Sequence, residues 1–132
     1  MPQQLTPDQM TMLGNNFLAI AQAVGDYRHT NVVNGNITQE QNQKLGNLQW
    51  TILNYADDFY TQATIVAIEN VQQSITAINN ITTQIQADYK RLNDVQKVIN
   101  VAAAVTTLGA AIMSLNAQAI VSGIDGVVNA LS

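Results

Sequence analysis

A long stretch without helix-breaking residues constrains the fold of this chain more than any other feature. Between Gly46 and Gly109 the sequence contains neither glycine nor proline. Glycine and proline are the residues that most often end helices, so their absence over such a length indicates long helices. We therefore expect an all-α protein, and the length of 132 residues suits a single domain over 1–132 with one core.

Apolar residues recur at heptad spacing through this stretch, in two successive registers. The first register consists of Leu45, Leu48, Ile52, Tyr55 and Phe59. Such spacing predicts amphipathic helices that pack along a seam, as in coiled coils. The second register consists of Ile68, Val71, Ile75, Ile78, Ile85, Tyr89, Leu92 and Ile99.

The two registers are out of phase, and the change lies within residues 63–70. Two interpretations fit it. The helix ends near Glu69 and Asn70 and the chain turns back, or one helix continues and changes its buried face between partners. Asn79 and Asn80 mark a second candidate break.

Two helix starts carry the same chemical signature. Thr6 precedes Pro7 and is followed three residues later by Gln9, and Thr38 is followed in the same way by Gln41. This spacing predicts a capping box at each start. The first helix is expected from about residue 7 to about residue 27, followed by a loop over 28–37 that contains the turn-forming pair Asn34-Gly35.

The C-terminal third has no charged side chain from Val98 to Ile124. We expect its helix to begin near Asn100 and to kink or turn at Gly109, and we expect residues 122–126 to form a turn or a helix end. The resulting prediction is a four-helix bundle with breaks near 28–37, 69–80 and 107–110. The alternative is one rod-like helix over 38–106, with the shorter terminal helices packed on it.

The composition excludes several classes of function. Charged residues make up 11% of the chain and the net charge is −4, while Asn and Gln number 15 each. Nucleic-acid binding requires several cations on one face, and here Lys90, Arg91 and Lys97 alternate with Asp88 and Asp94. We interpret that segment as a solvated helix face and expect no nucleic-acid partner.

No constellation of catalytic residues is present. The chain has no cysteine, and His29 is its only histidine, placed by the pattern in a loop. The adjacent Asp57 and Asp58 point about 100° apart on a helix, so they do not form a catalytic pair. The sequence therefore predicts neither an enzyme nor a metal or cofactor site.

The uncharged segment is long enough to cross a bilayer, but its amide side chains and small residues are unusual in a permanent span. Small residues recur four apart at Ala102, Thr106, Ala110 and Ser114, a pattern of close helix contacts. The first interpretation is a buried helix of a soluble bundle. The side chains that would contact lipid if the segment inserted are Val105, Leu108, Ile112, Met113, Leu115, Ile120 and Val121.

Two functions follow as expectations. The first is a non-catalytic helical protein that self-associates or docks a helical partner through its heptad seams. The second is a membrane-active protein that inserts residues 98–124; in composition, this combination resembles the α-helical pore-forming toxins. The N-terminal residues lack the basic and apolar regions of a conventional signal peptide, which fits a cytoplasmic protein or leaderless export.

Overall fold

The computed structural model describes residues 3–61, 67–68, 71–91, 94–114 and 116–132. Within these residues the protein is all-helical apart from one pair of two-residue strands, so the predicted fold class is confirmed. The described elements are β1 (Gln3–Gln4), α1 (Pro7–Val33), α2 (Gln39–Thr61), β2 (Ala67–Ile68), α3 (Val71–Asp88), α4 (Val95–Met113) and α5 (Ala117–Leu131).

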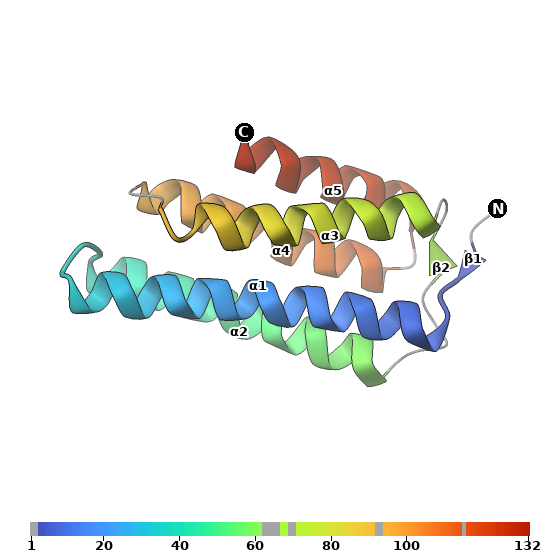
Figure 1. Cartoon of the computed structure of the whole chain (residues 1–132), viewed down its shortest axis with the longest axis horizontal. Coiled ribbons are helices and arrows are strands. Elements are labelled where there is room, and N and C mark those ends of the chain that lie inside the picture. The colour runs from blue at the N-terminus through green and yellow to red at the C-terminus, as the bar shows by residue number, and fades with distance from the viewer. Residues whose placement is uncertain (1–2, 62–66, 69–70, 92–93, 115) are drawn as a thin grey trace.

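The helices form a bundle in which each packs mainly against two others. The contacts follow a closed ring in the order α1, α2, α4, α5, α3 and back to α1. Figure 1 shows α1 and α2 lying together on one side, with α3, α4 and α5 on the other. The described chain thus forms a five-helix bundle rather than the four-helix one predicted. The alternative rod over 38–106 is wrong, because α2 ends at Thr61 and α3 runs back along α1.

Both predicted capping boxes are present. The backbone N–H of Gln9 donates to Thr6 Oγ1 at 3.1 Å, and the backbone N–H of Thr6 donates to Gln9 Oε1 at 2.9 Å. The same pair of bonds joins Thr38 and Gln41, at 3.1 and 2.9 Å. Each box satisfies backbone donors that a helix start leaves unpaired, which fixes where α1 and α2 begin.

Helix α1 is longer than predicted, and the loop after it is correspondingly shorter. The helix continues to Val33 instead of ending near residue 27. Asn31 Nδ2 donates to the Tyr27 carbonyl oxygen at 2.8 Å, so its side chain adds a bond along the last turns. Gly35 then adopts a φ of 72°, a left-handed conformation that glycine tolerates without strain.

The predicted break over 69–80 is wrong in its second half. Asn79 and Asn80 lie inside α3. Asn79 Oδ1 accepts a hydrogen bond from Asn16 Nδ2 of α1 at 2.7 Å, so its amide joins two helices instead of ending one. Most of the register change predicted within 63–70 lies outside the described residues. Ala67 and Ile68 pair there with Gln4 and Gln3 in an antiparallel register.

The boundary between α3 and α4 is not among the three predicted breaks, although a helix start was expected near Asn100. Helix α4 begins at Val95 rather than near Asn100, because Asp94 caps it by accepting from the Lys97 amide at 3.2 Å. Gly109, predicted as a kink or turn, lies inside α4.

Helix α4 ends instead at Met113, with Ser114 as its C-cap. Asn116 Oδ1 accepts from the amides of Gln118 and Ala119 at 3.0 and 3.2 Å and caps α5. The turn predicted over 122–126 is helical and belongs to α5.

The core runs along the axis of the bundle and draws on every helix. Its aromatic centre is Phe17 of α1, whose ring meets that of Phe59 of α2 edge to face with centroids 4.9 Å apart. The largest fully buried side chains are Phe17, Phe59, Met10, Leu13, Ile20, Leu45, Ile52, Ile78, Ile85, Leu108 and Ile112.

Candidate association surface on the last two helices

Helix α4 has two chemically different faces. Its inner face carries branched aliphatic side chains, among them Val105, Leu108 and Ile112, which are fully or almost fully buried. Its outer face carries small side chains instead, and Thr107 and Ala110 are exposed there. Branched side chains fill the core, whereas small ones leave a flat helix surface toward solvent.

This flat face continues onto α5 and forms a shallow groove of about 590 Å³. Among the described residues, none that lines the groove has a side chain larger than threonine. Helices approach each other most closely over surfaces of this kind, because no side chain holds their backbones apart. The lining residues are Ala104, Thr107, Ala110, Ala111, Ser114, Ala119, Ser122, Gly123 and Gly126.

None of the described residues that line the groove is charged. Lys97 precedes the uncharged segment, and Asp125 is the first charged residue after it. Lys97 is turned toward the chain end, where its Nζ lies 3.4 Å from the carbonyl oxygen of Ser132. A partner that covers this groove would therefore desolvate methyl groups, backbone and a few hydroxyls, which is far less costly than desolvating an ion.

The sequence pattern only partly separates this face from the core. Of the small residues spaced four apart, Ala102 is buried and Thr106 is half-buried, while Ala110 and Ser114 are exposed. Residues spaced four apart do not stay on one face of a helix, because the helix has 3.6 residues per turn. Spacings of three and four in alternation, as in Ala104, Thr107, Ala111 and Ser114, would have identified the groove.

The predicted seam residues lie inside the bundle itself. Leu48 and Tyr55 are half-buried and pack against the core. The side chains of Ile68 and Val71, and all of Leu92, fall outside the described residues. Those that are buried are Leu45, Ile52, Phe59, Ile75, Ile78, Ile85, Tyr89 and Ile99.

Most residues predicted to contact lipid also face inward. Val105, Leu108, Ile112 and Ile120 are buried, and Met113 is half-buried. Val121 is exposed, at 52%, and Leu115 is outside the described residues. Val95–Met113 nevertheless has the length and a mean hydropathy of 1.4 that would allow it to cross a membrane, although core helices of soluble proteins have the same properties.

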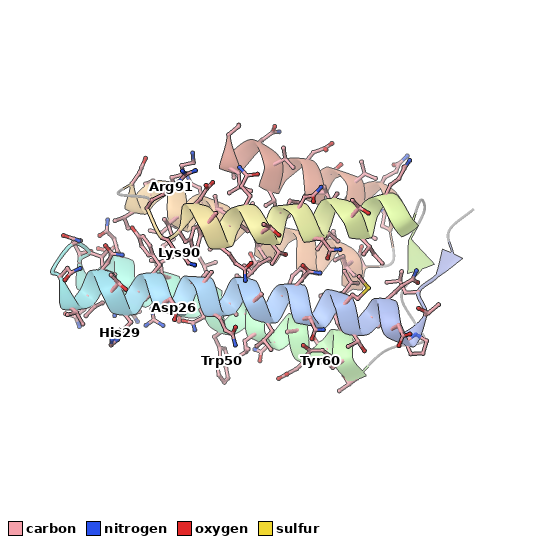
Figure 2. The ribbon with its side chains drawn as sticks, viewed as in Figure 1. Asp26, His29, Trp50, Tyr60, Lys90 and Arg91 are labelled. Carbon is pink, nitrogen blue, oxygen red and sulfur yellow. The ribbon has the colours of Figure 1, made fainter. Side chains whose placement is uncertain are left out.

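The charged and titratable candidates remain dispersed. His29 is exposed on α1 instead of in a loop, and Figure 2 shows it pointing away from the other helices. Asp57 is exposed and Asp58 half-buried on α2. Among the described residues, no three His, Cys, Asp or Glu side chains lie close enough to hold a metal ion.

The cationic segment is divided between the turn after α3, which holds Lys90 and Arg91, and the first turn of α4. Arg91 follows α3 and pairs with Asp88 at 3.1 Å, whereas Lys97 belongs to the first turn of α4.

Comparison with protein-family models, curated proteins and solved structures finds no match to this chain. Arguments about its function therefore rest on its own residues.

Proposed function

We propose that this protein is a non-catalytic association protein that docks a second copy of itself through the groove between α4 and α5. The observation that carries the proposal is the groove's lining, whose described residues are all Ala, Gly, Ser or Thr, along two adjacent helices. The heptad seams, which the sequence favoured for this role, are occupied by the protein's own core. In the folded bundle, association needs a surface outside them.

A second copy fits this surface because of its flatness. A two-fold symmetric contact brings the same patch of both molecules together, so the patch must be complementary to itself. A face without protruding side chains meets this requirement, and two α4 helices can approach closely along Ala104, Thr107 and Ala110. Each copy carries a net charge of −4, but none of that charge lies within the groove. Added salt should therefore strengthen or leave unchanged the association, since it screens only remote repulsion.

The test is a change of one side chain on this face. Thr107 is exposed, and its hydroxyl donates to the Ala103 carbonyl oxygen at 3.2 Å. Thr107→Arg places a long cation in the groove, and we expect the protein to be monomeric in sedimentation equilibrium. The parent protein is expected to show a monomer–dimer equilibrium between micromolar and millimolar concentrations.

A closely matched control is available on α3. Thr83 is also exposed, and its hydroxyl donates to the carbonyl oxygen four residues earlier at 3.1 Å. Thr83→Arg adds the same charge and volume away from the groove, so it should leave the dimer intact. A strictly monomeric parent protein, or equal dissociation by both variants, would overturn the proposal.

The second candidate function is membrane insertion of the α4–α5 pair. It is favoured by the hydropathy of α4 and by the 27 uncharged residues from Val98 to Ile124. Insertion would require α4 to withdraw Val105, Leu108 and Ile112 from the core, whereas docking leaves the bundle intact. We therefore place docking first.

A vesicle assay distinguishes the two functions. Leakage of dye from neutral or anionic liposomes by the parent protein, abolished by Thr107→Arg but not by Thr83→Arg, would favour insertion. Absence of lipid binding at any pH, together with a dimer in lipid-free buffer, would exclude it.

A further inference from the structure

A second groove, unrelated to the association surface, lies between α1 and the end of α3. It has a volume of about 610 Å³ and is bordered by the α1–α2 loop. Its lining is mostly polar, in contrast to the groove on α4 and α5. The polar lining residues are Gln22, Asp26, Tyr27, Thr30, Asn31, Asn34, Asn36, Gln86, Tyr89, Lys90 and Arg91.

Two tyrosines form the inner wall of this groove. The rings of Tyr27 and Tyr89 lie 5.8 Å apart between centroids, and each residue is no more than 5% exposed. Tyr89 donates its hydroxyl to the Val98 carbonyl oxygen at 2.9 Å. The Tyr27 hydroxyl is buried and has no hydrogen-bond partner among the described residues.

An unpaired buried hydroxyl is uncommon, because nearly all buried polar groups in proteins are hydrogen-bonded. Burial, together with the nearby Asp94 carboxylate, raises the pKa of Tyr27, so the hydroxyl keeps its proton and remains a donor. A ligand in the groove would supply the missing acceptor. The side chains of Gln86 and Lys90 line the same groove and are exposed.

The rim of the groove carries charges of both signs, Asp26 on one side and Lys90 and Arg91 on the other. Asp26 lies on α1 and Lys90 in the turn that follows α3, and both are labelled in Figure 2. No ion pair involving either residue occurs in the described part of the chain, whereas the neighbouring Arg91 is bound to Asp88. Asp26 is suited to a ligand ammonium group, and Lys90 to a ligand carboxylate.

The remaining rim is held in place by the end of α1. The backbone N–H of Asn36 donates to the backbone carbonyl oxygen of Asn31 at 2.8 Å, and the side-chain Nδ2 of Asn36 donates to Asn31 Oδ1 at 3.2 Å. These bonds fold the short loop against the helix and leave amide groups along the groove. An amide rim offers both donors and acceptors, which suits a ligand side chain that is itself an amide.

We propose that this groove binds a small zwitterion of the α-amino-acid class with a polar side chain. The ammonium group lies at Asp26, the carboxylate at Lys90, and an oxygen acceptor of the ligand meets the Tyr27 hydroxyl. This site is separate from the proposed self-association, since it shares no residue with the groove on α4 and α5.

Three related compounds test the two charges separately. L-Glutamine carries both charges, N-acetyl-L-glutamine lacks the ammonium group, and L-glutaminamide lacks the carboxylate. Binding is followed by changes in amide chemical shifts of the ¹⁵N-labelled protein, together with titration calorimetry. We expect saturable binding of L-glutamine, with the largest shifts at Asn31, Asn36 and Gln86, and binding at least about tenfold weaker for the other two compounds.

Variants of the protein then test the individual residues. Tyr27→Phe removes only the unpaired hydroxyl, so we expect about tenfold weaker binding with a melting temperature that does not fall. Asp26→Asn and Lys90→Gln should each weaken binding of L-glutamine to a similar degree. Lys44→Gln is the control, because Lys44 is exposed on α2 and outside the groove.

Several outcomes would overturn the proposal. These are no saturable binding of L-glutamine to the limit of its solubility, equal binding of all three compounds, or unchanged binding by Tyr27→Phe. Glucose provides a final comparison. If glucose changes the same amide chemical shifts while L-glutamine does not bind, the groove recognises a polyol, and the proposed zwitterionic ligand is wrong.

Discussion

The ring of Tyr55 in α2 lies against the backbone of Gly109 in α4. A β-carbon on residue 109 would be 2.5 Å from Tyr55 Cδ2 and 2.8 Å from Tyr55 Cγ, closer than side chains approach one another. The contact involves the base of the ring and not a flexible tip, so the ring cannot move aside alone. Gly109 is thus retained inside a helix because it allows α2 and α4 to pack together.

Gly109→Ala should destabilise the protein in spite of the higher helix propensity of alanine. The propensity gain is at most about 1 kcal/mol, whereas forcing an extra methyl group into a packed contact costs about 1–3 kcal/mol. Urea unfolding followed by circular dichroism measures the difference. Trp50, the only tryptophan, is 65% exposed in the folded protein and would report unfolding poorly.

Gly126→Ala provides the matched comparison. Gly126 lies in α5, and a β-carbon there would meet nothing within 4 Å. We expect the free energy of unfolding to rise by up to about 1 kcal/mol, measured at a concentration where the protein is monomeric. If the two alanine variants shift stability in the same direction, the close contact between Gly109 and Tyr55 does not exist in solution.

Thr38→Ala should cost about 1 kcal/mol of stability, because it removes the hydroxyl oxygen that accepts from the backbone N–H of Gln41 at the start of α2. Thr38→Ser retains that oxygen and should restore most of the loss. Thermal unfolding of the two variants, side by side with the parent, measures the effect. Equal melting temperatures for Ala and Ser would show that the cap contributes nothing.

The paired tyrosines should respond differently to loss of their hydroxyl groups. Tyr89→Phe breaks a buried bond to the Val98 carbonyl oxygen and should cost about 1 kcal/mol. Tyr27→Phe removes a buried hydroxyl without a partner among the described residues, so stability should be unchanged or higher. A larger loss for Tyr27→Phe than for Tyr89→Phe in chemical denaturation would reverse this assignment.

Stability should also fall in alkaline solution. Burial is the main cause that raises the pKa of both tyrosines above the ordinary value of about 10. The unfolded chain therefore loses these protons first as the pH rises past about 10, and the folded state is progressively disfavoured. Below pH 10 both states keep the protons and the stability conferred by burial is fully present. Each tyrosine contributes a fall of at most about 1.4 kcal/mol per pH unit, and Tyr89→Phe should flatten the decline measured by urea unfolding.

The starts of α1 and α2 could be predicted from the sequence because they depend on bonds between residues three apart, whereas the starts of α4 and α5, capped by Asp94 and Asn116, were not. Thr6 and Thr38 carry their partners in the same few residues, and both caps are present. Helix ends depended on tertiary contacts that a single sequence does not reveal. Asn79 continues α3 because its side chain is bonded to Asn16 of another helix, and Gly109 continues α4 because Tyr55 packs on it.

The candidate surfaces were harder to predict than the fold. The uncharged segment was evident in the sequence, but which of its small residues face outward depends on the exact phase of α4 against α2 and α5. The polar groove was not predicted at all. Asp26 and Lys90 are far apart in sequence and line the same groove only because α3 packs on α1. The unpaired hydroxyl of Tyr27 likewise has no local signature.

Ile78→Asp tests whether the second heptad register forms the core. Ile78 is fully buried in α3, so an aspartate there would be an unpaired buried charge costing several kcal/mol, and the domain should unfold. Asn80→Asp is the control, because Asn80 is exposed on the same helix and the new charge stays in water. If Ile78→Asp retains the helical circular dichroism and melting temperature of the parent, α3 must be rotated from the position described here.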